Sequence, residues 1–232
     1  MLLKKIIFFF LGALTCASCL WAGDTASFVD LGFSNDGRIY AFGQYGVQSR
    51  TLKPWADIYI VDVAKNEFVP GGRVSYVHSS SIIVGQDGSG VFYNLVGNNK
   101  ALMDRYGVIF SNQGQPLFIS LEPYPPANGE TVEFRDFSSG KSYKARLVPT
   151  FEGTGNNLKS SFYINLDVSS PLGVSRRYTI GNPQIKRPMI RQYNINRVII
   201  DSRGNSLIFV IEMIVNSEDG PNIRYMVETV RF

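Results

Sequence analysis

The sequence has only two cysteines and one histidine among 232 residues. Both cysteines lie within the first 22 residues, so a chain that starts near Gly23 has no thiol, no disulfide and no cysteine nucleophile. His78 alone excludes a zinc site built from several histidines, and a Ser-His-Asp triad would have to use it. The chain also lacks the G-x-S-x-G elbow and the glycine-rich loops that bind nucleotide phosphates. We therefore predict no catalytic residues of these classes, no metal and no cofactor.

Residues 1–22 have the pattern of an export signal. Lys4-Lys5 precedes an apolar run from Ile6 to Leu14, and small residues follow. The run is shorter than the ~20 apolar residues of a transmembrane helix. We expect export to the periplasm or outside the cell, with residues 23–232 as a single β-rich domain. A second interpretation stays open, because Cys16-Ala17-Ser18-Cys19 resembles a degenerate lipobox in which Cys19 would be lipidated.

Little net charge remains after the signal. Without Lys4-Lys5 the count falls from 23 to 21 basic residues against 19 acidic ones, a net of +2 instead of +4. The densest basic segment, 176–191, is interrupted by Tyr, Ile and Pro. A nucleic-acid-binding domain normally carries a continuous basic stripe. No nucleic-acid partner is expected, and membrane contact is expected only through a lipid at Cys19.

Strand-forming residues dominate the rest of the chain. Runs of four to eight aromatic and β-branched residues are bounded by Gly, Asn, Asp, Ser and Pro, as in short antiparallel strands. Residues 28–33 and 38–42 flank Asp36-Gly37. These two residues readily adopt the positive φ angles that a tight hairpin turn requires. A second hairpin is expected over 57–69. The fold class is therefore mainly β, an antiparallel meander of hairpin units.

Similar units recur along the chain. The stretch 110–114 repeats the pattern of 33–37 at a distance of 77 residues, and the hairpin pattern of 132–147 follows it. A third occurrence covers 198–211, with a further strand at 223–230. Such repetition indicates repeated meander units, and a propeller-like arrangement is one way to pack them.

One segment departs from the strand pattern. Between Gly88 and Tyr106 the apolar residues recur at helical spacing, and Asp87 or Ser89 can cap the first turn. We predict one amphipathic helix inserted near 88–106, with its apolar stripe in the core.

Three stretches resemble an uncharacterised family of predicted secreted bacterial proteins, a domain of unknown function: FVDLGFSNDGRIYAFGQYGVQS, PWADIYIVDVAKNEFVPGG and SEDGPNIRYMVETV. This resemblance covers nearly the whole mature chain and implies export and an all-β fold, but no activity. Residues 33–62 are also similar to β-propeller blades of the periplasmic component of the Tol system. Propeller blades repeat every ~40 to 45 residues, whereas these units are 77 and 90 residues apart.

Two hypotheses for function follow. Exposed aromatic rings near loops can stack on a sugar or contact a protein, and Tyr45, Trp55, Tyr124 and Tyr193 are the candidate binding residues. We favour a non-catalytic binding or envelope-associated protein with a protein or glycan partner. The alternative is a carboxylate-based glycan hydrolase, which needs only two acids at a fixed separation. Its candidates are Asp62, Asp136, Asp167 and Glu212.

Overall fold

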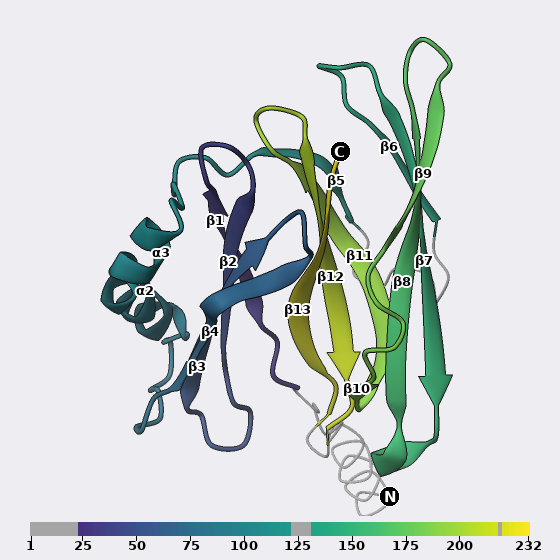
Figure 1. Cartoon of the computed structure of the whole chain (residues 1–232). Coiled ribbons are helices and arrows are strands. Elements are labelled where there is room, and N and C mark those ends of the chain that lie inside the picture. The colour runs from purple at the N-terminus through teal and green to yellow at the C-terminus, as the bar shows by residue number, and fades with distance from the viewer. Residues whose placement is uncertain (1–22, 122–130, 218–219) are drawn as a thin grey trace, which may run out of the picture.

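Three antiparallel sheets and a pair of helices are stacked as four layers (Figure 1). The computed structural model describes residues 23–121, 131–217 and 220–232. From one side of the molecule to the other, the helices cover the first sheet, the first sheet packs on a middle sheet, and the middle sheet packs on a third (Figure 1). Residues 1–22, which were predicted as the signal and include Cys19, lie outside the described residues.

The first sheet is a meander of four consecutive strands: β1 (Ser27–Phe33), β2 (Ile39–Val47), β3 (Pro54–Asp62) and β4 (Glu67–Val77). The turn between β1 and β2 closes with hydrogen bonds from the Ser34 N–H to the Ile39 carbonyl and from the Gly37 N–H to the Ser34 carbonyl. Gly37 has φ +68°. Both hairpins predicted for this part of the chain are confirmed.

The middle sheet has the order β13-β12-β11-β5. Its strands are β5 (Gln115–Ile119), β11 (Ile190–Ile200), β12 (Ser206–Val215) and β13 (Asn222–Arg231). Side chains of β12 alternate between two cores. Leu207 and Phe209 face the third sheet, whereas Ile208 and Val210 face the first. The predicted hairpin over 198–211 and the strand after it are confirmed.

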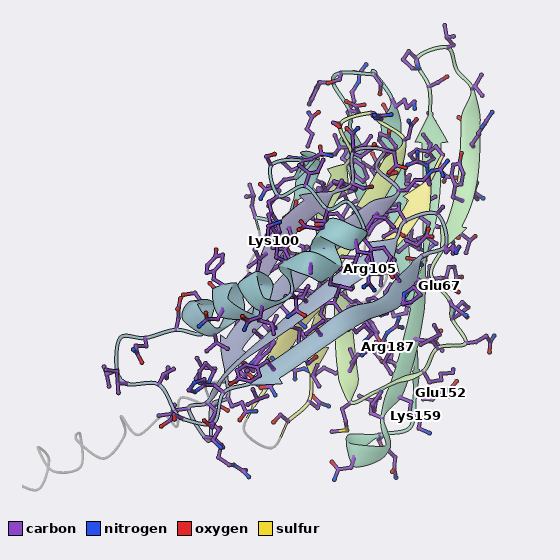
Figure 2. All side chains as sticks on the ribbon, turned by 60° about the vertical axis from the view of Figure 1, so that its left-hand side comes forward. Glu67, Lys100, Arg105, Glu152, Lys159 and Arg187 are labelled. Atoms are coloured by element: carbon purple, nitrogen blue, oxygen red, sulfur yellow. The ribbon has the colours of Figure 1, made fainter. Side chains whose placement is uncertain are left out.

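The third sheet contains β6 (Thr131–Arg135), β7 (Ser142–Glu152), β8 (Lys159–Ser169), β9 (Ser175–Ile180) and the short β10 (Arg187–Pro188). A 3-10 helix, η2 (Gly155–Asn157), lies between β7 and β8. Strands β7 and β8 pair over eleven residues each. Figure 2 shows Glu152, Lys159 and Arg187 close to the end of this sheet where η2 lies.

The helical insertion is two helices rather than the one predicted. Helix α2 (Ser89–Asn98) and helix α3 (Lys100–Arg105) meet at Asn99, whose φ of −107° and ψ of 16° leave the helical range. The Asn99 side chain donates to the Leu95 carbonyl and so occupies a backbone acceptor of α2. The predicted apolar stripe is correct, because Phe92 and Met103 are buried against the first sheet. Figure 2 shows both helices lying across the outer face of that sheet.

The second repeated unit predicted from the sequence is wrong. Residues 110–114 form no hairpin turn, and β5 after them pairs with β11 in the middle sheet. The predicted hairpin of β6 and β7 forms, but it belongs to the third sheet. The residues of 110–114 resemble those of the turn at 33–37. The strand that pairs with β5 is decided by packing between segments far apart in the sequence. The described strands are stacked in layers, so the propeller-like arrangement is not formed by them.

In the described part of the chain, no helix is long and apolar enough to cross a membrane.

Candidate functional site

Trp55, one of the predicted binding aromatics, lies in the core. Only 5% of it is exposed. Its Nε1–H donates to Asp24 Oδ2 at 2.9 Å, and the Arg224 guanidinium lies 4.2 Å from its ring centroid. Arg224 also donates to Asp24 Oδ2 at 2.6 Å. The indole therefore joins the first sheet to the middle sheet, and its faces are not available to a ligand.

Tyr45 and Tyr193 do not share an exposed surface with Trp55. Tyr193 is 1% exposed, and its hydroxyl is 2.8 Å from Ser160 Oγ between the middle and third sheets. Tyr45 is half-buried, with its ring 5.4 Å from that of Phe92 on α2. Tyr124 lies outside the described residues. The expectation of exposed rings fails for Trp55 and Tyr193, because core packing uses their apolar faces.

Each of the candidate carboxylates has a hydrogen-bond or ion-pair partner of its own. Asp62 accepts the backbone N–H groups of a turn, Ala64 and Lys65, both at 3.1 Å. Asp167 forms an exposed ion pair with Arg177, which lowers the pKa of this carboxyl. Both carboxylates have structural partners.

Asp136 and Glu212 also make local contacts. Burial alone would raise the pKa of Asp136, but hydrogen bonds from Ser139 and Ser138 hold it below its usual value. Glu212 accepts from Asn194 Nδ2 at 3.1 Å in the middle sheet. Asp136 and Asp167 belong to the third sheet, Glu212 to the middle sheet and Asp62 to the first sheet, so the four acids do not gather in one site. Among the described residues, no three His, Cys, Asp or Glu side chains gather as metal ligands.

A groove does lie between the end of β4 and helix α2. Its larger part has a volume of about 660 Å³ and its smaller part about 340 Å³, and the two parts share His78, Val91 and Asn94. We call it the β4–α2 groove. It is lined by Pro54, Tyr76, His78, Ser80, Ser81, Ile82, Gly85, Gln86, Asp87, Ser89, Gly90, Val91, Asn94, Leu95 and Asn98.

Backbone hydrogen bonds hold the wall of the groove that follows β4. The His78 N–H donates to the Pro54 carbonyl at 2.9 Å, and the Ile82 N–H donates to the Leu52 carbonyl at 2.8 Å. These bonds keep the chain beside β3 after β4 has ended. The Gln86 side chain accepts from the Ile83 N–H at 3.1 Å and closes the loop on itself. These hydrogen bonds within the protein fix the position of the groove wall.

The backbone of Ser80 holds the His78 ring. Nδ1 lies 3.1 Å from the Ser80 N and 3.2 Å from the Ser80 carbonyl oxygen. A catalytic triad needs the opposite arrangement, with a carboxylate at Nδ1. The nearby Asp87 instead accepts from Ser89 N and Oγ, and the Ser89 hydrogen bonds lower its pKa. His78 Nδ1 is therefore engaged by the backbone and not by a carboxylate, as a triad histidine would be.

The lining of the groove is polar and nearly uncharged. Its hydrogen-bonding groups are side-chain amides, serine hydroxyls and the His78 ring, and Asp87 is the one acid among the lining residues. Neither Lys nor Arg is among them. Tyr76 adds a ring that is 46% exposed, beside Val91 and Leu95. Amide and hydroxyl groups beside an aromatic ring match a neutral, hydroxyl-rich ligand better than a phosphate.

Sequence reasoning did not identify this groove as a site. It considered His78 only for a zinc site or a triad, and Asp87 and Ser89 only as caps of the helix, and it did not bring the two segments together. The available signal was the pair of polar runs HSSS, residues 78–81, and QDGS, residues 86–89. The packing of α2 on the first sheet turns these loop residues into a groove.

Comparison with known proteins identifies a family. No curated protein and no solved structure matches the chain. The model of the family described as "Predicted secreted protein (DUF2259)" matches residues 41–231, which include β3, β4, both helices and the middle and third sheets. The match supports export. The chain belongs to this predicted secreted protein family.

Proposed function

We propose that the protein is an exported, non-catalytic glycan-binding protein of the cell envelope, with a sugar chain as the ligand of the β4–α2 groove. The observation that carries this proposal is the lining: exposed Tyr76 beside amide and hydroxyl groups, with no cation among the lining residues. Sugars offer hydroxyl groups to such donors and acceptors, and an apolar ring face to an aromatic side chain.

Three features of the groove favour binding over turnover. The carboxylate Asp87 is engaged by Ser89. The His78 ring is held by a backbone amide rather than by an acid. The groove is open and elongated along α2, with Asn94 and Asn98 one helical turn apart. This shape accommodates a chain of sugar units rather than one enclosed substrate.

The proposal is tested by titration calorimetry with two probes, chito-oligosaccharides and glycan strands released from peptidoglycan. Tyr76→Ala should weaken binding about tenfold, because the stacking surface is lost. Asn94→Ala should weaken it about fivefold through the loss of hydrogen bonds. Tyr93→Ala is the matched control: Tyr93 is on the same helix, 62% exposed and outside the groove lining.

The contrary outcomes are distinct. Absence of binding by either probe, or equal weakening by Tyr93→Ala and Tyr76→Ala, would exclude the groove as a glycan site. Release of new reducing ends from the probes would instead support the hydrolase alternative. In that case Asp136→Asn and Glu212→Gln would be the first variants to assay for loss of turnover.

A further inference from the structure

Two hairpin loops of the third sheet form a protruding tip. Residues 136–141 connect β6 to β7, and residues 170–174 connect β8 to β9. Figure 1 shows both loops extending beyond the other two sheets. They are side by side, since a Cβ on Gly140 would be 2.9 Å from the Pro171 side chain. We call these two segments the loop tip.

Backbone hydrogen bonds hold each loop in a fixed turn. The Asp136 N–H donates to the Lys141 carbonyl at 3.0 Å, and the Ser170 N–H donates to the Val174 carbonyl at 2.8 Å. Asp136 also accepts from the Ser138 N–H at 2.8 Å. The side chains that project from the tip are therefore presented by ordered backbone.

The tip exposes large apolar side chains at its end. Phe137 is 86% exposed, Leu172 92% and Val174 58%. Isolated exposed apolar residues are common on protein surfaces. Here three of them, from two separate hairpins, project from the same end of one sheet. Such a cluster indicates a contact surface.

Positive charge lies just behind the apolar end. Lys141 and Arg176 line a hollow of about 230 Å³ together with Tyr178 and Phe232. Lys141 Nζ is 5.7 Å from the Phe232 ring centroid. The acid of this turn, Asp136, is buried and accepts hydrogen bonds from Ser138 and Ser139, and the charge of Lys141 helps to lower its pKa. The tip therefore presents apolar groups in front and cations behind.

We propose that the loop tip binds a lipid bilayer that carries anionic headgroups. Phe137 and Leu172 would enter the interfacial region of the bilayer, and Lys141 and Arg176 would lie at the level of the phosphates. A stable protein partner usually buries about 800 Å² on each side, whereas this convex tip offers a few side chains. A bilayer accepts such a small wedge because lipids rearrange around it.

This contact is independent of a lipid at Cys19 and of the proposed glycan binding. The loop that joins β4 to α2 lies at the other end of the molecule from the tip (Figure 1). A protein held by the tip would present the β4–α2 groove away from the bilayer surface. The glycan proposal and the bilayer proposal can therefore fail separately.

The test is cosedimentation of the protein, purified after export, with vesicles of phosphatidylcholine alone and of phosphatidylcholine mixed with phosphatidylglycerol. The protein carries Cys19→Ser, so that no lipid can be attached. We expect binding to the mixed vesicles that weakens with salt. Phe137→Ser/Leu172→Ser should reduce the partition coefficient at least about tenfold. Lys141→Gln and Arg176→Gln should each reduce it about fivefold and only on the anionic vesicles.

Ile83→Ser/Val84→Ser is the matched control. These residues are 71% and 105% exposed on the loop before α2, where the sequence from 78 to 99 has no Lys or Arg. Vesicle binding should be unchanged in this variant.

A second readout places a reporter in the tip itself. Brominated lipids should quench the fluorescence of the tryptophan introduced by Phe137→Trp. They should not quench Trp55, the other tryptophan of residues 23–232, because Trp55 is buried. No binding to either vesicle, an equal loss in the control variant, or an unquenched tip tryptophan would overturn the proposal. A complex with a soluble protein that Phe137→Ser/Leu172→Ser abolishes, without any vesicle binding, would also overturn it.

Discussion

Polar side chains lie between the first and middle sheets, and burial changes their ionisation. Gln44, 3% exposed, donates to Asp57 at 3.2 Å and accepts from the Tyr225 N–H at 2.8 Å, which links the two sheets. Burial raises the pKa of Asp30 to about 6, although the Gly32 N–H and the Arg197 charge oppose this. Burial likewise raises the pKa of Glu228. These acids therefore make stability depend on pH.

Asp30→Asn should remove part of that pH dependence. The folded-state pKa of about 6 exceeds the unfolded value of 3.8, so the folded protein binds this proton more tightly. The stability contributed by protonated Asp30 is fully present below a pH of about 4 and is lost as the pH rises through about 6. The loss is about 2 kcal/mol, given partial exposure. Urea unfolding of both proteins between these pH values measures it.

Asp36→Asn is the control of opposite sign. The Ser34 hydroxyl lowers the pKa of this exposed acid, so its contribution is present near neutral pH and is lost on acidification. An unchanged pH profile for Asp30→Asn would contradict the assignment of Asp30 as a buried, weakly acidic group.

At the scale of elements, the turns of two different sheets fit together. Ser206 Oγ donates to the Gly37 carbonyl at 2.7 Å, and Asp201 accepts from the Ser206 N–H at 2.6 Å. Arg231 Nη1 donates to Ser206 Oγ at 2.7 Å. The β1–β2 hairpin is thereby fastened to the β11–β12 hairpin. Gly37 is required both by its φ of +68° and by this approach.

A pair of glycine substitutions separates these two requirements. At Gly37 a Cβ would lie 2.4 Å from Asp201 Oδ2, whereas at Gly204, with φ +70°, nothing lies within 4 Å. Gly204→Ala should lower the free energy of unfolding by about 1 kcal/mol through backbone strain alone. Gly37→Ala should lower it by about 3 kcal/mol, because strain and steric clash add. Thermal or urea unfolding provides the measurement. Equal losses of unfolding free energy in the two variants would show that the two hairpins are not in tight contact at Gly37.

At the scale of the whole molecule, the middle sheet is shared by two cores. Its strand β12 is buried on both faces, so the third sheet and the first sheet each depend on it. The helices add a further core on the outer face of the first sheet. Loss of the middle sheet would expose all of the apolar surface between the three sheets. We therefore expect the described layers to unfold together.

Leu207→Ala and Ile208→Ala test this expectation. The two residues are neighbours on β12, both fully buried, and face the third and first sheets respectively. Each substitution should lower the free energy of unfolding by about 2–4 kcal/mol. Urea unfolding followed by Trp55 fluorescence and by far-UV circular dichroism should give coincident curves for both variants. A shift of only the dichroism curve in Leu207→Ala would mean that the third sheet unfolds separately.

The turns and strands were predictable, whereas the sites were not. Asp36-Gly37 and Ser138-Ser139-Gly140 indicate hairpins because a tight turn depends on the φ preferences of its own residues. The Gln113-Gly114 segment led to a wrong hairpin prediction, because turn residues say nothing about the strand partner. Strand β5 pairs with β11, about 80 residues away. Trp55 and Tyr193 were predicted as exposed rings because loop residues surround them in the sequence. Their burial depends on sheets that pack from distant segments.

The sequence by itself determined the mainly β composition, most hairpin positions and the apolar face of the helical insertion, since each depends on residues close together in the chain. It also indicated export through residues 1–22, in agreement with the predicted secreted family. Only the tertiary structure decided that three sheets stack in layers, that His78 and Asn94 share a groove, and that Phe137 and Leu172 project from one tip. The physical reason is that burial of apolar surface between sheets is non-directional and joins segments that no local pattern connects.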